Sequence, residues 1–153
     1  MDTIRFLFVV AAYKNWKVFQ LDVKSAFLNG ILQEEIYVEQ PAGFVIQEKE
    51  DKVYLLKKAL YGLKQAPRAW YDRIDDYLTG SGFQKSLSEA TLYVKKNNND
   101  VLVISLYVDD LLVTRSNTQQ VEEFKQKMMH VFEMTSLGLV SFFLGMEIKQ
   151  SKE

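Results

Sequence analysis

The strongest constraint on the fold is an apolar segment that two adjacent aspartates interrupt. Residues 101–106 are almost entirely apolar, and Asp109 and Asp110 stand between this run and a second apolar run at 111–113. This pattern predicts a β-hairpin that carries two carboxylates at its tip. Neighbouring like charges repel each other, so the pair requires something that offsets the repulsion. A bound Mg²⁺ ion, which prefers carboxylate oxygens, offsets it, and a solvated hairpin turn is the alternative.

A third aspartate far upstream favours the metal-binding interpretation. Apolar side chains at every second position from 19 to 23 alternate with Gln20 and Asp22, so a half-buried strand is predicted at 17–23. Residues 24–30 follow as a short helical or turn-like segment. If the strand lies beside the hairpin, the three aspartates form a cluster able to hold two metal ions. Such ions lie roughly 3.5–4 Å apart and clamp the attacking and leaving oxygens of a phosphoryl displacement.

Composition limits the classes of protein that fit this chain. With 153 residues, 48% of them hydrophobic, the chain is expected to build one core. Its longest apolar stretch, residues 6–12, is much shorter than the ~20 residues that cross a bilayer, and it lacks the features of a secretory signal. The absence of cysteine excludes disulfides and suits an intracellular protein. A net charge of −1 argues against a stand-alone nucleic-acid binder, although residues 57–73 form a basic stretch suited to phosphate contacts.

The periodicity of the sequence predicts an α+β fold. Helices are expected at 3–14 with Asp2 as N-cap, from Pro67 to 80, and at 118–132 with Asn117 or Thr118 as N-cap. Further strands are expected at 91–94, on both arms of the hairpin and at 142–148, with a polar turn at 95–100 and a two-stranded excursion at 31–56. Without the excursion the order is β-α-β-β-α-β, the split plan of an antiparallel sheet with helices on one face. This plan is compatible with Asp22 lying close to the hairpin.

Several long motifs resemble the reverse transcriptase of copia-type LTR retrotransposons. They are residues 20–30, 60–71 and 107–110, joined by the shorter segments 39–44 and 144–148. The likeness covers nearly the whole chain, and the motifs occur in the order and spacing of that family. Residues 137–140 depart from the family, which usually has an acidic or small polar pair at this position.

The resemblance implies a palm domain with part of the fingers of an RNA-directed DNA polymerase. A single domain would cover 1–153, with the palm at 1–30 and 67–153 and a fingers-like excursion at 31–66. The implied catalytic carboxylates, which would also bind metal together with the backbone carbonyl of Val23, are Asp22, Asp109 and Asp110. Two Mg²⁺ ions, for which Mn²⁺ can substitute, would lower the pKa of the primer 3′-hydroxyl and hold the nucleotide phosphates.

The resemblance also implies binding residues for nucleotide and nucleic acid. Phe27 would lie under the incoming sugar and favour deoxynucleotides by crowding a 2′-hydroxyl, with a plain core position as the alternative. Tyr61 and Gly62 would line the nucleotide pocket. The residues implied to contact nucleic acid are Lys64, Arg68 and Tyr107, although a solvated basic loop is the alternative for the first two.

The implied partners are an RNA or DNA template with its primer, deoxynucleoside triphosphates, and the missing fingers, thumb and RNase H segments of a polyprotein. The implied location is intracellular, in a cytoplasmic particle or the nucleus, and no membrane partner is expected. The alternative hypothesis is a truncated, non-catalytic remnant of a retrotransposon that binds nucleic acid weakly at most.

Overall fold

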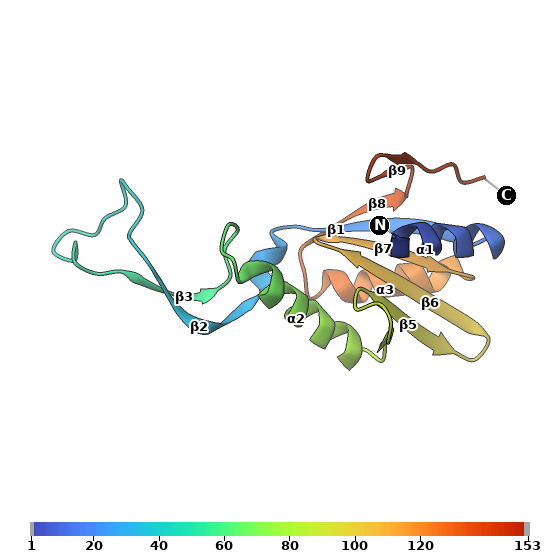
Figure 1. Cartoon of the computed structure of the whole chain (residues 1–153), viewed down its shortest axis with the longest axis horizontal. Helices are drawn as coiled ribbons and strands as arrows, with labels where there is room; N and C mark the ends of the chain where they lie inside the picture. The colour runs from blue at the N-terminus through green and yellow to red at the C-terminus, as the bar shows by residue number, and fades with distance from the viewer. Residues whose placement is uncertain (1, 152–153) are drawn as a thin grey trace. The chain divides into compact units, whose positions relative to one another are not determined.

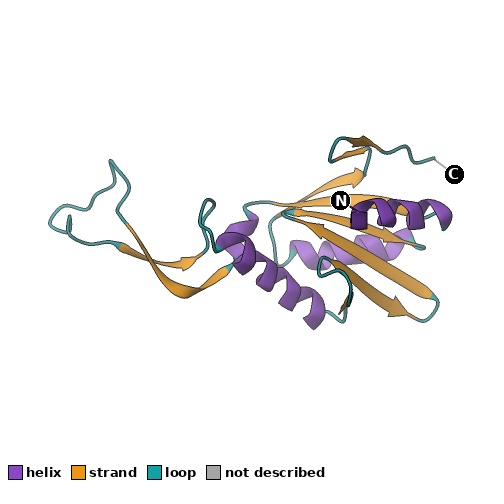
Figure 2. Ribbon diagram, viewed as in Figure 1, coloured by secondary structure: helices purple, strands orange, loops and turns teal. Residues whose placement is uncertain are grey.

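The computed structural model describes residues 2–151, and the chain divides into two compact units. The first unit consists of Met1–Lys24 and Tyr77–Glu153, and the second consists of Ser25–Asp76. Figure 1 follows the chain through both units, and Figure 2 distinguishes the helices from the strands. None of the helices within residues 2–151 is long and apolar enough to cross a membrane.

Four helical segments and ten strands are described along the chain. The helices are α1 (Asp2–Tyr13), the 3₁₀ helix η1 (Ala26–Asn29), α2 (Ala66–Gly80) and α3 (Thr118–Met129). The strands are β1 (Lys17–Val23), β2 (Ile31–Val38), β3 (Tyr54–Lys58), β4 (Gln84–Lys85), β5 (Leu92–Asn97), β6 (Asp100–Tyr107), β7 (Asp110–Arg115), β8 (Met134–Leu139), β9 (Phe142–Phe143) and β10 (Met146–Glu147).

A six-stranded sheet forms the centre of the first unit, with the strand order β4-β5-β6-β7-β1-β8. All neighbouring pairs are antiparallel, which confirms the predicted class of an α+β fold with an antiparallel sheet. The strand predicted at 17–23 and both arms of the aspartate hairpin are confirmed. Because β1 lies between β7 and β8, the strand that carries Asp22 is the direct neighbour of the hairpin.

Helices cover both faces of this sheet, so the prediction that all helices lie on one face is wrong. Apolar side chains of α1 form a buried cluster with Val18 of β1 and Leu112 of β7. On the opposite face, Leu102 lines a cavity together with Phe124 of α3. Figure 1 shows α1 in front of the sheet and α3 behind it. The central strands bury apolar residues on both faces, including Leu111 beside Leu112, so both faces require a cover.

Other corrections concern the ends of elements. Asp2 lies inside α1 and is not its N-cap, whereas Asn117 caps α3 by accepting a 3.0 Å hydrogen bond from the backbone N–H of Gln119. Helix α3 ends at Met129, three residues before the predicted end. The polar turn predicted at 95–100 is confined to its middle, because 95–97 belong to β5 and Asp100 begins β6.

The predicted strand at 142–148 is a tight hairpin of β9 and β10 instead. Its turn consists of Leu144 and Gly145, which both have positive φ angles, of 47° and 80°. The neighbouring strand β8, which extends the sheet beyond β1, was not predicted. Gly138 interrupts its hydrophobic pattern and has a φ of 73°, which explains why the periodicity of this strand is weak.

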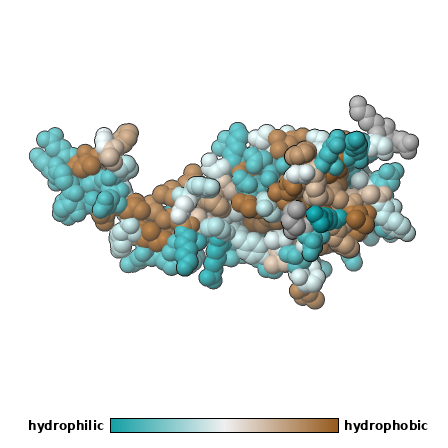
Figure 3. All heavy atoms as spheres, turned by 45° about the horizontal axis from the view of Figure 1, so that its top comes forward, coloured by the Kyte–Doolittle hydropathy of each residue, from teal (hydrophilic) through white to brown (hydrophobic). Residues whose placement is uncertain are grey.

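The second unit is built on the antiparallel ribbon of β2 and β3. Both strands are present where the excursion predicts short strands, at 35–38 and 53–56, and β2 begins four residues earlier, at Ile31. The loop between them is exposed and mainly hydrophilic on the face shown in Figure 3, although Phe44, Val45 and Ile46 are also exposed. The functional division into a palm at 1–30 and 67–153 and a fingers-like excursion at 31–66 stays a prediction.

Candidate active site

The candidate site begins with a pairing between two distant acidic residues. In the β1–β7 ladder, Asp22 lies directly opposite Asp110. Residues at opposed positions of an antiparallel pair point to the same face of the sheet. The backbone N–H of Val23 donates a 2.8 Å hydrogen bond to the carbonyl of Asp109, which extends the contact to the hairpin turn. The two aspartate-bearing segments that the sequence singled out are therefore adjacent.

The hairpin turn holds its first central residue in an unusual conformation. Tyr107 pairs with Asp110, so Val108 and Asp109 are the two central residues of the turn. Val108 has a φ of 53°, in the left-handed region that glycine normally occupies. A β-branched residue in this region is strained by roughly 1–3 kcal/mol, and such strain is concentrated at functional sites. Asp109 is thus at the tip of the hairpin, whereas Asp110 is the first residue of β7.

The carboxylate of Asp110 shows the electrostatic effect of its neighbours. Burial raises its pKa, and the negative charges of Asp109 and Asp22 raise it further, whereas a hydrogen bond from Gln20 lowers it. This bond joins Nε2 of Gln20 to Oδ1 of Asp110 at 3.0 Å. The carboxylates of Asp109 and Asp22 are therefore both close enough to act on the carboxylate of Asp110.

The donor atoms at this site suit a divalent cation in their chemistry. Three carboxylates and a backbone carbonyl are hard oxygen ligands of the kind that Mg²⁺ prefers. Within residues 2–151, however, no three side chains of His, Cys, Asp or Glu form a group that could hold a metal ion. One oxygen of Asp110 is bound to Gln20 instead. The predicted role of Asp22, Asp109, Asp110 and the carbonyl of Val23 as metal ligands stays a prediction.

Tyr107, predicted to lie by the primer terminus, contacts the β9–β10 hairpin. Its ring meets the ring of Phe143 edge to face, with centroids 6.0 Å apart and planes at 79°. Phe143 is buried, while Phe142 next to it is exposed. Neither Gln20 nor Phe143 was among the residues predicted to lie at the site. The two-residue period that placed Gln20 on the same face as Asp22 would have identified it.

The predicted nucleotide-binding residues meet in the second unit. The rings of Phe27 and Tyr61 stack with centroids 5.6 Å apart and planes at 23°. Phe27 is only partly buried. Gly62 follows Tyr61 with a φ of 93°, in a turn that the 3.2 Å hydrogen bond from the N–H of Leu63 to the carbonyl of Leu60 closes.

The two basic residues predicted to contact nucleic acid are both exposed. Lys64 lies just before α2, and Arg68 lies in the first turn of that helix. The guanidinium of Arg68 approaches Asp72 one turn later, at 4.0 Å, with both side chains largely exposed. A surface pair of this kind contributes little to stability, so the guanidinium remains accessible to another anion.

Comparison with known proteins identifies the relatives of this chain. The family described as "Reverse transcriptase (RNA-dependent DNA polymerase)" matches residues 1–153. The chain is 39% identical over 148 residues to the Retrovirus-related Pol polyprotein from transposon RE2 of Arabidopsis thaliana, covering 97% of this chain and 10% of the relative. It is 40% identical over 153 residues to the corresponding polyprotein from transposon TNT 1-94 of Nicotiana tabacum, covering 99% of the chain and 12% of the relative.

A shorter relative shows the same likeness. The putative transposon Ty5-1 protein of Saccharomyces cerevisiae is 40% identical over 131 residues, which cover 86% of this chain and 42% of that protein. No solved structure matches the chain. The chain spans about a tenth of the length of the two plant polyproteins. These relatives confirm the resemblance to copia-type retrotransposons, and the chain belongs to the reverse transcriptase (RNA-dependent DNA polymerase) family.

Proposed function

We propose that this chain is the catalytic palm of a reverse transcriptase and transfers deoxynucleotides to a primer on an RNA template. The observation that carries the proposal is the pairing of Asp22 opposite Asp110, with Asp109 in the adjoining turn. The raised pKa of Asp110 supports it, because a carboxylate kept beside two others is costly unless its site serves a cation. In the reaction, the primer 3′-oxygen bonds to the α-phosphorus while the bond to the β-phosphate oxygen breaks. The hydroxyl proton is lost and pyrophosphate leaves.

The three aspartates and the carbonyl of Val23 would hold Mg²⁺ or Mn²⁺. Two such ions supply charge neutralisation, which makes the 3′-hydroxyl more acidic and stabilises the leaving pyrophosphate. The contribution of the protein itself is to bring the carboxylates together. Strand pairing fixes Asp22 against Asp110, and the strained turn at Val108 sets the position of Asp109.

The remaining predicted residues are assigned to substrate binding. Phe27 would crowd the ribose 2′-hydroxyl, and Tyr61 with Gly62 would line the nucleotide pocket. The exposed side chains of Lys64 and Arg68 would bind phosphates of the template, and Tyr107 would lie against the primer terminus. Other segments of a Pol polyprotein, including the rest of the fingers, the thumb and an RNase H domain, would complete the enzyme inside a cytoplasmic particle or the nucleus.

One observation favours a second function, that of a non-catalytic remnant with weak affinity for nucleic acid. Among residues 2–151 the carboxylates are adjacent without forming a group that could hold a metal ion. The net charge of −1 also gives the chain little general attraction for nucleic acid.

Primer extension on an RNA template with Mg²⁺ or Mn²⁺ tests the leading proposal. We expect extension by the wild type and none by Asp109→Asn. Asp51→Asn, which removes an exposed carboxylate of the loop between β2 and β3, is the matched control and should extend normally. Equal extension by wild type and Asp109→Asn would refute the assigned role. Salt-dependent binding of an RNA–DNA hybrid without extension would support the remnant instead.

A further inference from the structure

The aromatic rings of Phe27 and Tyr61 form a stacked pair in the second unit. A centroid separation of 5.6 Å and an angle of 23° between the planes describe an offset stack, which is a favourable arrangement of two aromatic rings. Tyr61 is 91% exposed with Phe27 in place, so the stack covers only a small part of its surface and most of the residue faces solvent. The small angle between the planes shows that one face of the Tyr61 ring is turned toward Phe27.

The backbone of the second unit brings the two residues together. Ile31 at the start of β2 pairs with Lys58 at the end of β3. The pairing continues by one step, because the N–H of Ala59 donates a 2.9 Å hydrogen bond to the carbonyl of Gly30. Phe27 lies shortly before Gly30, which precedes β2, and Tyr61 lies shortly after Ala59, which follows β3. The base of the ribbon therefore places their backbones side by side.

A reverse turn then sets the position of Tyr61. Residues 60–63 are closed by the hydrogen bond from Leu63 N–H to the Leu60 carbonyl, and the third residue, Gly62, has a φ of 93°. This is the pattern of a type II turn, in which glycine is required at the third position and the second residue occupies the corner. Tyr61 is that corner residue, which explains why it is exposed while its backbone is held by the turn.

The base of the ribbon has little freedom to move. A side chain at Gly30 would lie 2.8 Å from the carbonyl carbon of Ala69, so the backbone of η1 is packed directly against the first turns of α2. Ala59, Ala66 and Trp70 are buried in the same region. Tight packing and backbone hydrogen bonds therefore hold the backbone segments that carry Phe27 and Tyr61.

We infer that Tyr61 is a positioning residue that holds the ring of Phe27 in place and thereby sets the discrimination between deoxynucleotides and ribonucleotides. The inference rests on the proposed function, in which Phe27 excludes the 2′-hydroxyl. A ring can exclude a hydroxyl only if it cannot turn aside, and the stack opposes that rotation. The loss of one aromatic stack corresponds to about 2- to 10-fold in a ratio of rate constants.

The position of the Phe27 ring is measured first, by ¹⁹F NMR of protein labelled with 4-fluorophenylalanine. Phe27→Leu assigns the resonance by its absence. We expect Tyr61→Ala to shift and narrow the Phe27 resonance, and Tyr61→Phe to preserve it. Tyr37→Ala, which removes another exposed tyrosine of the same ribbon, is the matched control. A Phe27 resonance that is unchanged in Tyr61→Ala would overturn the inference whether or not the chain is active.

The selectivity is measured by single-nucleotide insertion, as the ratio of kcat/KM for a deoxynucleotide to that for the matching ribonucleotide. We expect Tyr61→Ala to lower this ratio about 2- to 10-fold and Tyr61→Phe to retain it. In a Phe27→Ala background, Tyr61→Ala should lower the ratio no further. A fall in kcat with an unchanged ratio would overturn the inference and leave the proposed function standing. A wild type that inserts neither nucleotide would instead count against the proposed function.

Discussion

Gln20 donates a hydrogen bond to Asp110, the residue that faces Asp22 across the β1–β7 ladder. The bond occupies one carboxylate oxygen of Asp110 and lowers the cost of its charge. It therefore does part of what a cation would do at this site. Gln20 lies on the same face of the sheet as Asp22 because every second side chain of a strand points to the same face.

The first prediction is that Asp110→Asn stabilises the protein in the absence of metal at neutral pH. Because the pKa of Asp110 in the folded state lies above its ordinary value, the ionised carboxylate lowers the free energy of unfolding. This penalty is absent below the ordinary pKa and complete above the raised one. Urea unfolding between pH 4 and 8 should therefore show a gain for Asp110→Asn that grows with pH. Asp51→Asn controls for the loss of one negative charge. A variant less stable than wild type at pH 7 would contradict the assignment.

The second prediction is that Mg²⁺ raises the free energy of unfolding of the wild type. A ligand that binds only the folded state stabilises it by about 2.7 kcal/mol at 100 times its Kd. The gain should be reduced in Asp22→Asn and in Asp110→Asn, because each removes one predicted ligand, and unchanged in Asp51→Asn. Thermal unfolding over a series of Mg²⁺ concentrations measures it. Equal gains in all four proteins would show that the cation binds elsewhere.

The sequence predicted those parts of the fold whose hydrophobic period is strong. Strand 17–23 and both arms of the hairpin alternate or run apolar without interruption, and all three are present. The position of α1 could not be predicted in this way. Its periodicity shows that one side is buried, but the face of the sheet that it covers depends on the contact with Val18 and Leu112, which local sequence does not encode.

Polar and glycine-containing strands escaped prediction for a related reason. The polar sequence at 95–100 predicts a turn, yet Lys95 lies within β5. There its Nζ donates a 2.8 Å hydrogen bond to the carbonyl of Ser81. Within the site, the predicted order of elements is compatible with the observed proximity of Asp22 to the hairpin. The hydrogen bond from Gln20 and the stack between Phe27 and Tyr61 depend on side-chain packing that only the structure describes.

The third prediction concerns the packing of η1 against α2. Gly30 has an ordinary φ of −73°, so alanine is acceptable to its backbone, but the new Cβ would lie 2.8 Å from backbone atoms of Ala69 and Trp70. Because those atoms belong to a helix, relief requires a shift of the backbone. Overpacking of this kind costs about 1–3 kcal/mol. Gly80→Ala is the matched control, since a Cβ there meets nothing within 4 Å. Chemical denaturation should rank Gly30→Ala well below Gly80→Ala, and equal stabilities would contradict this packing.

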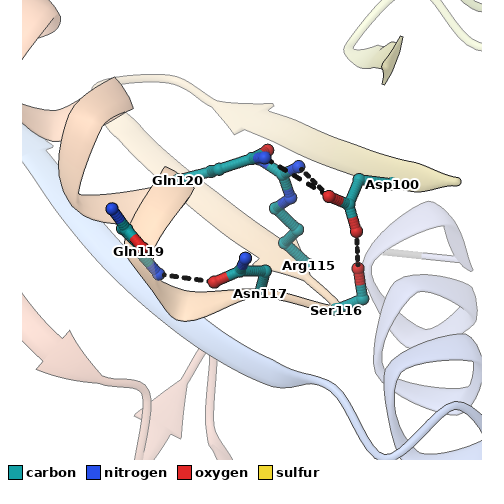
Figure 4. A network of polar contacts seen from close by, with 6 residues as sticks. All are labelled: Asp100, Arg115, Ser116, Asn117, Gln119 and Gln120. Atoms are coloured by element: carbon teal, nitrogen blue, oxygen red, sulfur yellow. Dashed lines mark hydrogen bonds and ion pairs between the residues drawn. The ribbon is translucent and has the colours of Figure 1, made fainter. Parts of the chain in front are cut away.

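The fourth prediction concerns a buried cation on the face of the sheet that α3 covers. Arg115 is 5% exposed, and its guanidinium lies 3.1 Å from the carboxylate of Asp100, which also accepts hydrogen bonds from Ser116 and Gln120 (Figure 4). The Nε of Arg115 has no hydrogen-bond partner among the described residues, and the ion pair with Asp100 is made by Nη2.

Asp100→Asn should therefore destabilise the protein strongly, because it leaves the guanidinium of Arg115 buried beside a neutral amide. Breaking a buried ion pair costs roughly 3–5 kcal/mol. Asp100 is itself partly exposed, with 36% of its side chain accessible, so water screens the lost charge and the expected loss is about 2 kcal/mol. Asp72→Asn, which breaks the exposed pair with Arg68, should change the free energy of unfolding by less than about 0.5 kcal/mol. Urea denaturation of the two variants measures the difference. If both lose the same small amount, the charge of Arg115 is compensated by groups other than Asp100.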